Sequence, residues 1–229
     1  MKKLKNRTAR ILLATSAVVI AYSIHFFGDF RSVEQKLEDS VVHLNKSILW
    51  TNPLTGVAAV KKVVSATGYF IKHNRSVYVI TNAHVCMSFS HLHASNRVEL
   101  LGVVEIIITD TEDDLCIGKL TKKIKKGWSP TPLKLADSEP DYGDEAYTYG
   151  YPLMFGGVHR KGRVLNTIKN VGGSSALGLK MFVTWGQSGS PVVDKNGKVV
   201  CTIFARSGPS DSFGYCKQLY KLKKLLGIL

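Results

Sequence analysis

The chain has 229 residues, of which 45% are hydrophobic and 21% are charged, and its formal net charge is +14. These proportions are typical of a globular protein with a core, and the absence of a repeat period or low-complexity segment argues against repeat arrays and disordered chains. A basic surface can attract nucleic acid, anionic lipid or acidic substrates, but no RNA- or DNA-binding signature accompanies the charge. We therefore predict no nucleic-acid partner.

The N-terminus carries a basic segment followed by an apolar one. Residues 1–10 contain five cations and form a predicted cytoplasmic tail, and residues 11–28 contain no acid and no lysine. An apolar stretch of about 18 residues is near the lower limit for crossing a bilayer, and the preceding cations resist translocation. We predict a single-pass transmembrane helix over 11–28, a polar tether over 29–38, and a domain on the periplasmic or extracellular side. The alternative is a cleaved signal peptide and a secreted protein, although no clear A-x-A cleavage site is present.

The remainder, residues 39–229, has the pattern of one all-β domain. Short apolar runs separated by turn residues predict strands over 41–44, 57–64, 68–71, 77–81, 98–101, 103–108, 114–120, 145–149, 158–164, 180–183, 191–193, 199–204 and 213–216. Such a series with almost no helix indicates a sandwich or a barrel. One helix is predicted at the end, over 217–229, with an apolar stripe formed by Leu219, Leu222, Leu225 and Leu226.

The four cysteines are Cys86, Cys116, Cys201 and Cys216. They form no CxxC pair and no Cys/His cluster with the spacing of a zinc site, so we predict no metal and no cofactor. Cys86 and Cys116 stand in apolar contexts and are interpreted as small buried hydrophobic residues. Cys201 and Cys216 could face each other across a late hairpin, and whether they form a disulfide stays open.

Three segments carry residue types that serve nucleophilic catalysis. His84 follows an apolar run, where a histidine could act as a general base, and Asp114 directly precedes another run, where a carboxylate could orient that histidine. Ser188 lies in the sequence Gly186-Gln187-Ser188-Gly189, whose glycines allow a sharp turn that exposes the hydroxyl. The backbone N–H groups of Gly186 and Ser188 could then stabilise an oxyanion.

Each of these signals is weak alone, because lone histidines, acidic turns and Gly-Ser loops are common. Together they occur in the order His, Asp, Ser, which is the chymotrypsin order and differs from the subtilisin and α/β-hydrolase orders. We therefore predict a serine endopeptidase that hydrolyses peptide bonds through His84, Asp114 and Ser188 and an acyl-enzyme intermediate. The alternative is a catalytically inactive protease-fold binding module at the membrane.

The sequence resembles trypsin-like protease domains, most closely the protease domain of the bacterial high-temperature-requirement (Deg-type) family. The segments that carry the likeness are 66–71 (ATGYFI), 77–85 (VYVITNAHV), 110–117, 132–137 (PLKLAD), 150–153 and 186–193. The resemblance implies two six-stranded antiparallel β-barrels with the triad in the cleft between them. Gln187 and Ser190 stand where the family usually has Asn and Gly, and no PDZ domain is expected to follow.

The resemblance also places a primary specificity pocket. It implies that the segment 203–207 lines the pocket and that Phe182 lies near its base. Phe182 and Phe204 favour a shallow or apolar pocket, whereas Arg206, which follows Ala205, favours an acidic substrate side chain, and the sequence does not decide between them. The predicted partners are polypeptide substrates and, through residues 11–28, the membrane; the sequence does not predict the oligomeric state.

Overall fold

The computed structural model describes residues 31–51, 58–87, 89–96, 99–152, 156–171, 173–208 and 213–228. The predicted cytoplasmic tail and transmembrane segment lie outside these residues. Among the described residues, no helix is both long enough and apolar enough to cross a bilayer. The chain divides into two compact units, Met1–Ser32 and Val33–Leu229, and the elements of the fold belong to the second.

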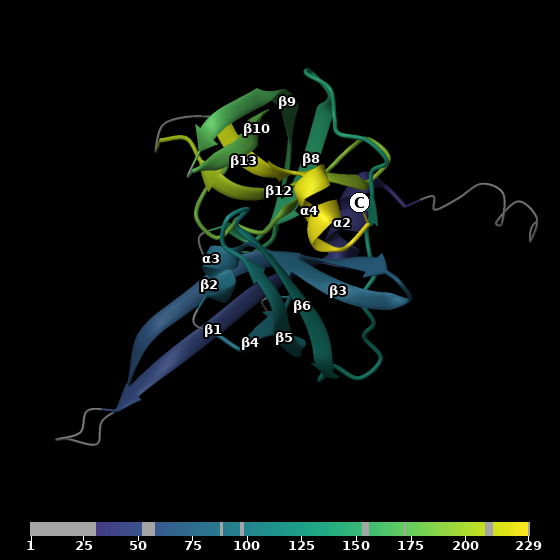
Figure 1. Cartoon of the computed structure of the whole chain (residues 1–229). Helices are drawn as coiled ribbons and strands as arrows, with labels where there is room; N and C mark the ends of the chain where they lie inside the picture. The colour runs from purple at the N-terminus through teal and green to yellow at the C-terminus, as the bar shows by residue number, and fades with distance from the viewer. Residues whose placement is uncertain are drawn as a thin grey trace, which may run out of the picture. The chain divides into compact units, whose positions relative to one another are not determined.

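The first half of the second unit forms a closed barrel. Its strands are β1 (Val41–Thr51), β2 (Ala58–His73), β3 (Ser76–Thr81), β4 (His91–Ser95), β5 (Leu100–Asp110) and β6 (Leu115–Lys123). They pair in the closed order β1-β2-β3-β6-β5-β4 (Figure 1). Alternate residues point inward, as in β4, where Leu92 and Ala94 are buried while His91 and His93 are exposed. The short helix α3 (Ala83–Cys86) follows β3 and packs Val85 into the same core.

The second half forms another barrel. Its strands are β8 (Glu145–Gly150), β9 (Val158–Val171), β10 (Ser174–Lys180), β11 (Pro191–Val193), β12 (Lys198–Arg206) and β13 (Phe213–Gln218). They neighbour one another in the order β11-β8-β9-β10-β13-β12, and a pairing of β11 with β12 closes the ring. The two-residue strand β7 (Lys134–Leu135) adds to β12 in parallel. The predicted pair of six-stranded antiparallel barrels is therefore confirmed.

A third apolar cluster lies between the barrels and includes one residue from each of two further helices, Leu37 and Leu222. It joins Tyr69 and Leu115 of the first barrel to Val199 of the second, and the Tyr69 hydroxyl is 2.8 Å from Oγ1 of Thr202. The helix α4 (Leu219–Leu225) contributes Leu222, as the predicted leucine stripe requires. This shared core holds the two barrels against each other.

The range predicted as a tether contains a helix that the sequence pattern did not indicate. The helix α2 (Val33–Ser40) covers the last six residues of the range 29–38, and it packs against β8. Leu37 is only 1% exposed because it enters the core between the barrels. This part of the range is therefore folded against the domain and is not an extended linker.

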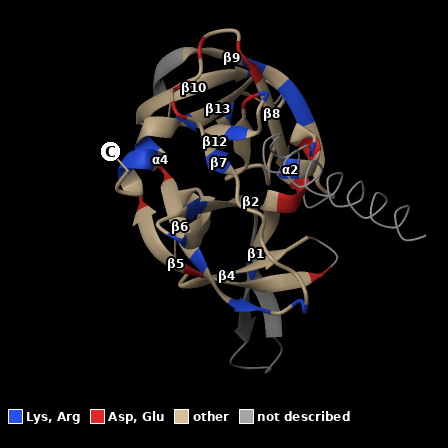
Figure 2. Ribbon diagram, turned by 90° about the vertical axis from the view of Figure 1, so that its right-hand side faces the viewer, with Lys and Arg blue, Asp and Glu red and all other residues tan. Residues whose placement is uncertain are grey.

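The basic residues are spread over the second unit. Figure 2 shows Lys and Arg on α4 and on strands of both barrels, interspersed with acidic residues. In this view, the positive charge does not gather into one continuous strip.

Candidate active site

The first barrel positions His84 at the end of β3. The strand ends at Thr81, whose hydroxyl donates to the carbonyl oxygen of Thr67 over 2.8 Å. Asn82 is the N-cap residue of the helix α3, and His84 is the second residue of that helix. The His84 side chain is 43% exposed, so the imidazole is accessible from solvent.

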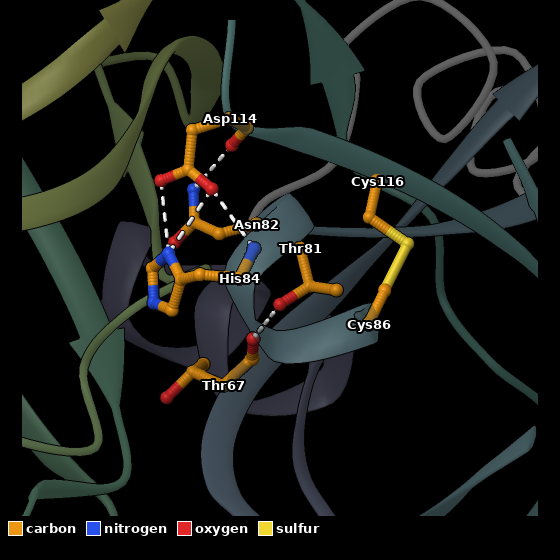
Figure 3. Close-up of a disulfide and its surroundings, with 7 residues drawn as sticks. All are labelled: Thr67, Thr81, Asn82, His84, Cys86, Asp114 and Cys116. Atoms are coloured by element: carbon orange, nitrogen blue, oxygen red, sulfur yellow. Dashed lines mark hydrogen bonds and ion pairs between the residues drawn. A yellow bond between two sulfur atoms is a disulfide. The ribbon is translucent and has the colours of Figure 1, made fainter. Parts of the chain in front are cut away.

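Asp114 holds the imidazole of His84 from the turn before β6. Its Oδ2 lies 2.9 Å from Nδ1 of His84, and its Oδ1 lies 3.0 Å from the same nitrogen (Figure 3). Oδ1 also accepts the backbone N–H of His84 over 3.0 Å, and Asn82 Nδ2 donates to the Asp114 carbonyl over 3.0 Å. Because a carboxylate only accepts, Nδ1 donates in this contact, and in the neutral imidazole Nε2 is then the acceptor. The structure thus brings together two of the three predicted catalytic side chains.

Ser188 lies in a tight loop before β11. Gly186 and Gly189 have φ angles of 90° and 84°, a region that glycine adopts without steric cost. A Cβ on Gly189 would come within 2.1 Å of the Thr67 carbonyl oxygen and 2.2 Å of Thr81 Oγ1. The loop is therefore pressed against the strands that lead to His84. The sequence pattern indicated these glycines but not the close approach that requires Gly189.

The backbone of the Ser188 loop leaves the two predicted oxyanion donors available. Among the described residues, neither the N–H of Gly186 nor that of Ser188 donates to a carbonyl oxygen, whereas Gln187 N donates to Thr184 O and Gly189 N to Ile203 O. Among the described residues, the ring of His84 is hydrogen-bonded to Asp114 and not to Ser188. Catalytic hydrogen bonds of this kind often form only when substrate is bound.

Each of three aromatic side chains near the predicted specificity pocket carries a cation on its ring. Cζ of Arg160 lies 4.8 Å from the ring centroid of Phe182, and Cζ of Arg206 lies 5.0 Å from that of Trp185. Nζ of Lys217 lies 3.9 Å from the centroid of Phe204. Phe182, Phe204 and Arg206 were predicted from the sequence. Their respective partners Arg160, Lys217 and Trp185 were not, because they come from other parts of the chain.

Lys217 is the most buried of these cations, with only 2% of the residue exposed. Burial lowers the pKa of Lys217, and the neighbouring Lys221 ammonium lowers it further, while the carboxylate of Asp114 has the opposite effect. Ala205, also predicted at the pocket, is partly buried and pairs with Tyr215 of β13.

Two disulfides join elements of the site and its scaffold. Cys86 bonds to Cys116 with a Cα–Cα distance of 6.5 Å, and Cys201 bonds to Cys216 with a distance of 5.6 Å. The interpretation of the first two as unpaired hydrophobic residues is wrong, although both are buried in the first barrel's core as expected. The reason is that α3 and β6 bring together two residues 30 positions apart, and no local pattern encodes that approach.

The Cys86–Cys116 bond links the two segments that carry the His84–Asp114 pair. Each cysteine lies two residues after one member of that pair, and Figure 3 shows the bond beside them. Replacing both cysteines with alanine should lower the free energy of unfolding by about 2–4 kcal/mol. It should also lower kcat about tenfold or more, because small displacements of catalytic groups are costly. Urea unfolding and steady-state kinetics measure the two effects.

The matched control is the double alanine variant of Cys201 and Cys216. Its bond closes a loop of 15 residues against 30 for the other, and it lies in the second barrel between β12 and β13. We expect a stability loss of the same order but a smaller loss of kcat. Equal losses of kcat in the two variants would show that the first disulfide has no particular effect on the His84–Asp114 pair.

Two closed β-barrels with a His–Asp pair where they meet define a chymotrypsin-fold serine protease. The family profile described as the trypsin-like peptidase domain matches residues 66–201. That range is more than half of the chain, and the chain belongs to this family of serine proteases.

Solved structures share this fold. The active form of the Rv3671c protease from M. tuberculosis has a TM-score of 0.67 and 21% identity, over 85% of this chain and 82% of that one. The HtrA-type protease AlgW with a decapeptide has a TM-score of 0.66 and 18% identity, over 84% of this chain and 64% of that one. No curated protein sequence matched the chain.

Proposed function

We propose that the chain is an active serine endopeptidase in which Ser188 is the nucleophile, His84 the general base and Asp114 the residue that orients the base. The observation that carries the proposal is the paired contact of the Asp114 carboxylate with Nδ1 and the backbone N–H of His84. This contact leaves Nε2 as an acceptor on an accessible imidazole, which is the state a general base requires.

The proposed reaction proceeds through an acyl-enzyme. As Oγ of Ser188 bonds to the scissile carbonyl carbon, Nε2 of His84 takes the hydroxyl proton and the carbonyl electrons move to oxygen. The N–H groups of Gly186 and Ser188 donate to that oxyanion. The intermediate collapses by breaking the C–N bond, and His84 gives its proton to the leaving amine. Water then hydrolyses the ester by the same steps, with His84 again accepting and returning the proton.

Two measurements separate this proposal from the inactive binding module. The full-length chain should be labelled covalently at Ser188 by an organophosphonate serine probe, and it should cleave an unfolded protein into fragments that mass spectrometry identifies. A chain that neither reacts with the probe nor cleaves, while still retaining peptides, would instead be a binding module.

We propose polypeptides as substrates, held by Phe182, Phe204, Ala205 and Arg206. Among the described residues, Arg206 has no carboxylate partner; its guanidinium lies on Trp185, and its Nη1 donates to the Gly208 carbonyl over 3.3 Å. Trp185 is 68% exposed and stands three residues before Ser188. An acidic substrate side chain could therefore pair with Arg206 beside the nucleophile.

Replacing Arg206 with glutamine should lower kcat/KM for peptides with an acidic residue at the cleaved bond by roughly two- to fivefold, the worth of a partly exposed ion pair. A set of peptides that differ only at that residue measures the preference. Peptides with an apolar residue there serve as the control and should change little. An equal loss for both sets would contradict charge recognition by Arg206.

We also propose that residues 1–10 are a cytoplasmic tail, 11–28 a membrane anchor, 29–38 a tether whose last part is folded in α2, and 39–229 the protease domain outside the cytoplasm. The cation-flanked apolar segment supports this topology. The two disulfides also support it, since such bonds persist in oxidising compartments. Fractionation of cells that express a C-terminally tagged chain tests the proposal. Membrane-bound full-length protein with a tag open to external protease supports an anchor, and soluble protein lacking its first residues indicates a cleaved signal.

A further inference from the structure

Thr67 holds the backbone of the Ser188 loop from the opposite barrel. It lies on β2 and is fully buried, with 0% exposure. Its backbone N–H donates to the carbonyl oxygen of Ser188 over 2.9 Å, and its hydroxyl donates to the carbonyl oxygen of Gly186, also over 2.9 Å. One residue thus binds the carbonyls of both residues whose N–H groups are the proposed oxyanion donors.

The other contacts of Thr67 tie this loop to the rest of the site. Its carbonyl oxygen accepts the hydroxyl of Thr81, which ends the strand before His84, over 2.8 Å. Its Oγ1 accepts the backbone N–H of Tyr151, just after β8, over 3.0 Å. Figure 3 shows Thr67 below His84, joined by a hydrogen bond to Thr81. Every polar atom of Thr67 is therefore bonded, and together they connect both barrels.

The two bonds from Thr67 to the loop hold the peptide units on either side of the one that carries the Ser188 N–H. The Gly186 carbonyl belongs to the unit shared with Gln187, and the Ser188 carbonyl belongs to the unit shared with Gly189. The N–H of Ser188 lies in the unit between them. Because peptide units are planar and rotate only about φ and ψ, anchoring the two outer units limits how the middle one can turn. The Gly186 backbone has little torsional preference of its own, so its orientation depends on such contacts.

We infer that Thr67 is a positioning residue that keeps the N–H groups of Gly186 and Ser188 directed at the oxyanion, an inference that rests on the proposed protease function. It does not touch the reacting atoms and acts through the carbonyls it binds. Removing its hydroxyl would take one hydrogen bond from the Gly186 carbonyl and one from the Tyr151 N–H, and it would let the loop turn toward other acceptors. The chemical step would suffer more than substrate binding.

The test compares Thr67→Val, which removes the hydroxyl and keeps the shape, with Thr67→Ser, which keeps the hydroxyl. Loss of one oxyanion donor costs about 10²–10³-fold in kcat, so we expect Thr67→Val to lower kcat about 100-fold. We expect KM to change by less than about threefold in the full-length chain. Thr67→Ser should retain kcat within about threefold of the parent chain.

The matched control is Thr148→Val. Thr148 is also 0% exposed, and its hydroxyl likewise donates to a backbone carbonyl, that of Pro191, over 2.6 Å. The Thr148 hydroxyl makes this single bond, to a carbonyl that follows the segment 186–189, whereas the Thr67 hydroxyl binds the Gly186 carbonyl and also accepts the Tyr151 N–H. A residue with a purely structural role would behave alike at both positions. We expect Thr148→Val to lose stability in thermal unfolding while its kcat stays near that of the parent chain.

A kcat of Thr67→Val within threefold of the parent chain, or a Thr67→Ser variant as impaired as Thr67→Val, would overturn the inference. If Thr67→Val does not fold, Thr67→Cys makes the same comparison, since it differs from Thr67→Ser only in replacing oxygen with a weak sulfur donor. Failure of the proposed function looks different: the parent chain would cleave no better than Ser188→Ala, whatever Thr67 does.

Discussion

Replacing Ser188 with alanine is expected to lower kcat about 10⁶-fold, the scale of loss when the nucleophile of a serine-protease triad is removed. Without Oγ, no acyl-enzyme can form, and only the oxyanion donors and substrate binding remain to assist water. KM should change little, because the hydroxyl contributes little to holding the peptide. Steady-state cleavage of a fluorogenic peptide and covalent labelling by an organophosphonate measure the two losses together.

The neighbouring hydroxyl provides the control. Ser190 stands two residues on, is 0% exposed, and its Oγ has no hydrogen-bond partner among the described residues. Ser190→Ala should keep most of the activity, and it should not destabilise the fold, because it removes a buried polar atom that lacks a partner. Activity lost with Ser190→Ala and kept with Ser188→Ala would reverse the assignment of the nucleophile.

Replacing Asp114 with asparagine should lower kcat about 10⁴-fold, as tautomer loss does in chymotrypsin-type triads. The asparagine amide can donate to Nδ1 of His84, which would then place the proton on Nε2 and remove the general base. The backbone of Asp114 has a φ of 49°, and asparagine tolerates this left-handed region better than most residues. The fold should therefore survive, which circular dichroism and thermal unfolding can verify.

Asp113 is the matched control for Asp114, and the structure gives it a different task. Its Oδ1 forms an ion pair with Nζ of Lys221 on α4, a lysine whose side chain is only 6% exposed. Asp113→Asn leaves that cation without its charge partner, so it should lower the free energy of unfolding by at most about 3–5 kcal/mol. The rate of the folded enzyme should be nearly unchanged. The opposite ranking of the two variants in kcat would contradict the assignment of Asp114.

Most strands of the fold follow from the sequence, and the exceptions have physical causes. The pairs of runs predicted over 57–64 and 68–71, and over 98–101 and 103–108, became the single strands β2 and β5, because pairing with neighbours continues across the residues 65–67 and across Gly102. The strand β4 was not predicted, since its residues HLHAS include only one large aliphatic side chain. It is held by pairing with β1 and β5. The strand β10 (Ser174–Lys180) was not predicted either, and the strand predicted over 180–183 is wrong, because β10 ends at Lys180.

The residues of the candidate site also fall into those that the sequence indicated and those that only the structure revealed. Residue types and their order indicated His84, Asp114 and Ser188, and the structure brings the first two into direct contact. The choice of Asp114 over Asp113 also came from local position before a strand. Local position did not indicate the partners of Phe182 and Phe204 or the role inferred for Thr67. Each of these depends on contacts between segments that are far apart in the sequence.

The sequence by itself determined the alternation of apolar residues that makes strands, the glycines that the Ser188 loop needs, and the apolar stripe of α4. These are properties of neighbouring residues, and torsional preference and periodicity express them directly. Only the tertiary structure decided the Cys86–Cys116 bond, the docking of α2 through Leu37, and the bonds from Thr67 to the Ser188 loop. The last of these joins residues 119 positions apart, and such contacts exist only once two separately closed barrels pack together across a common core.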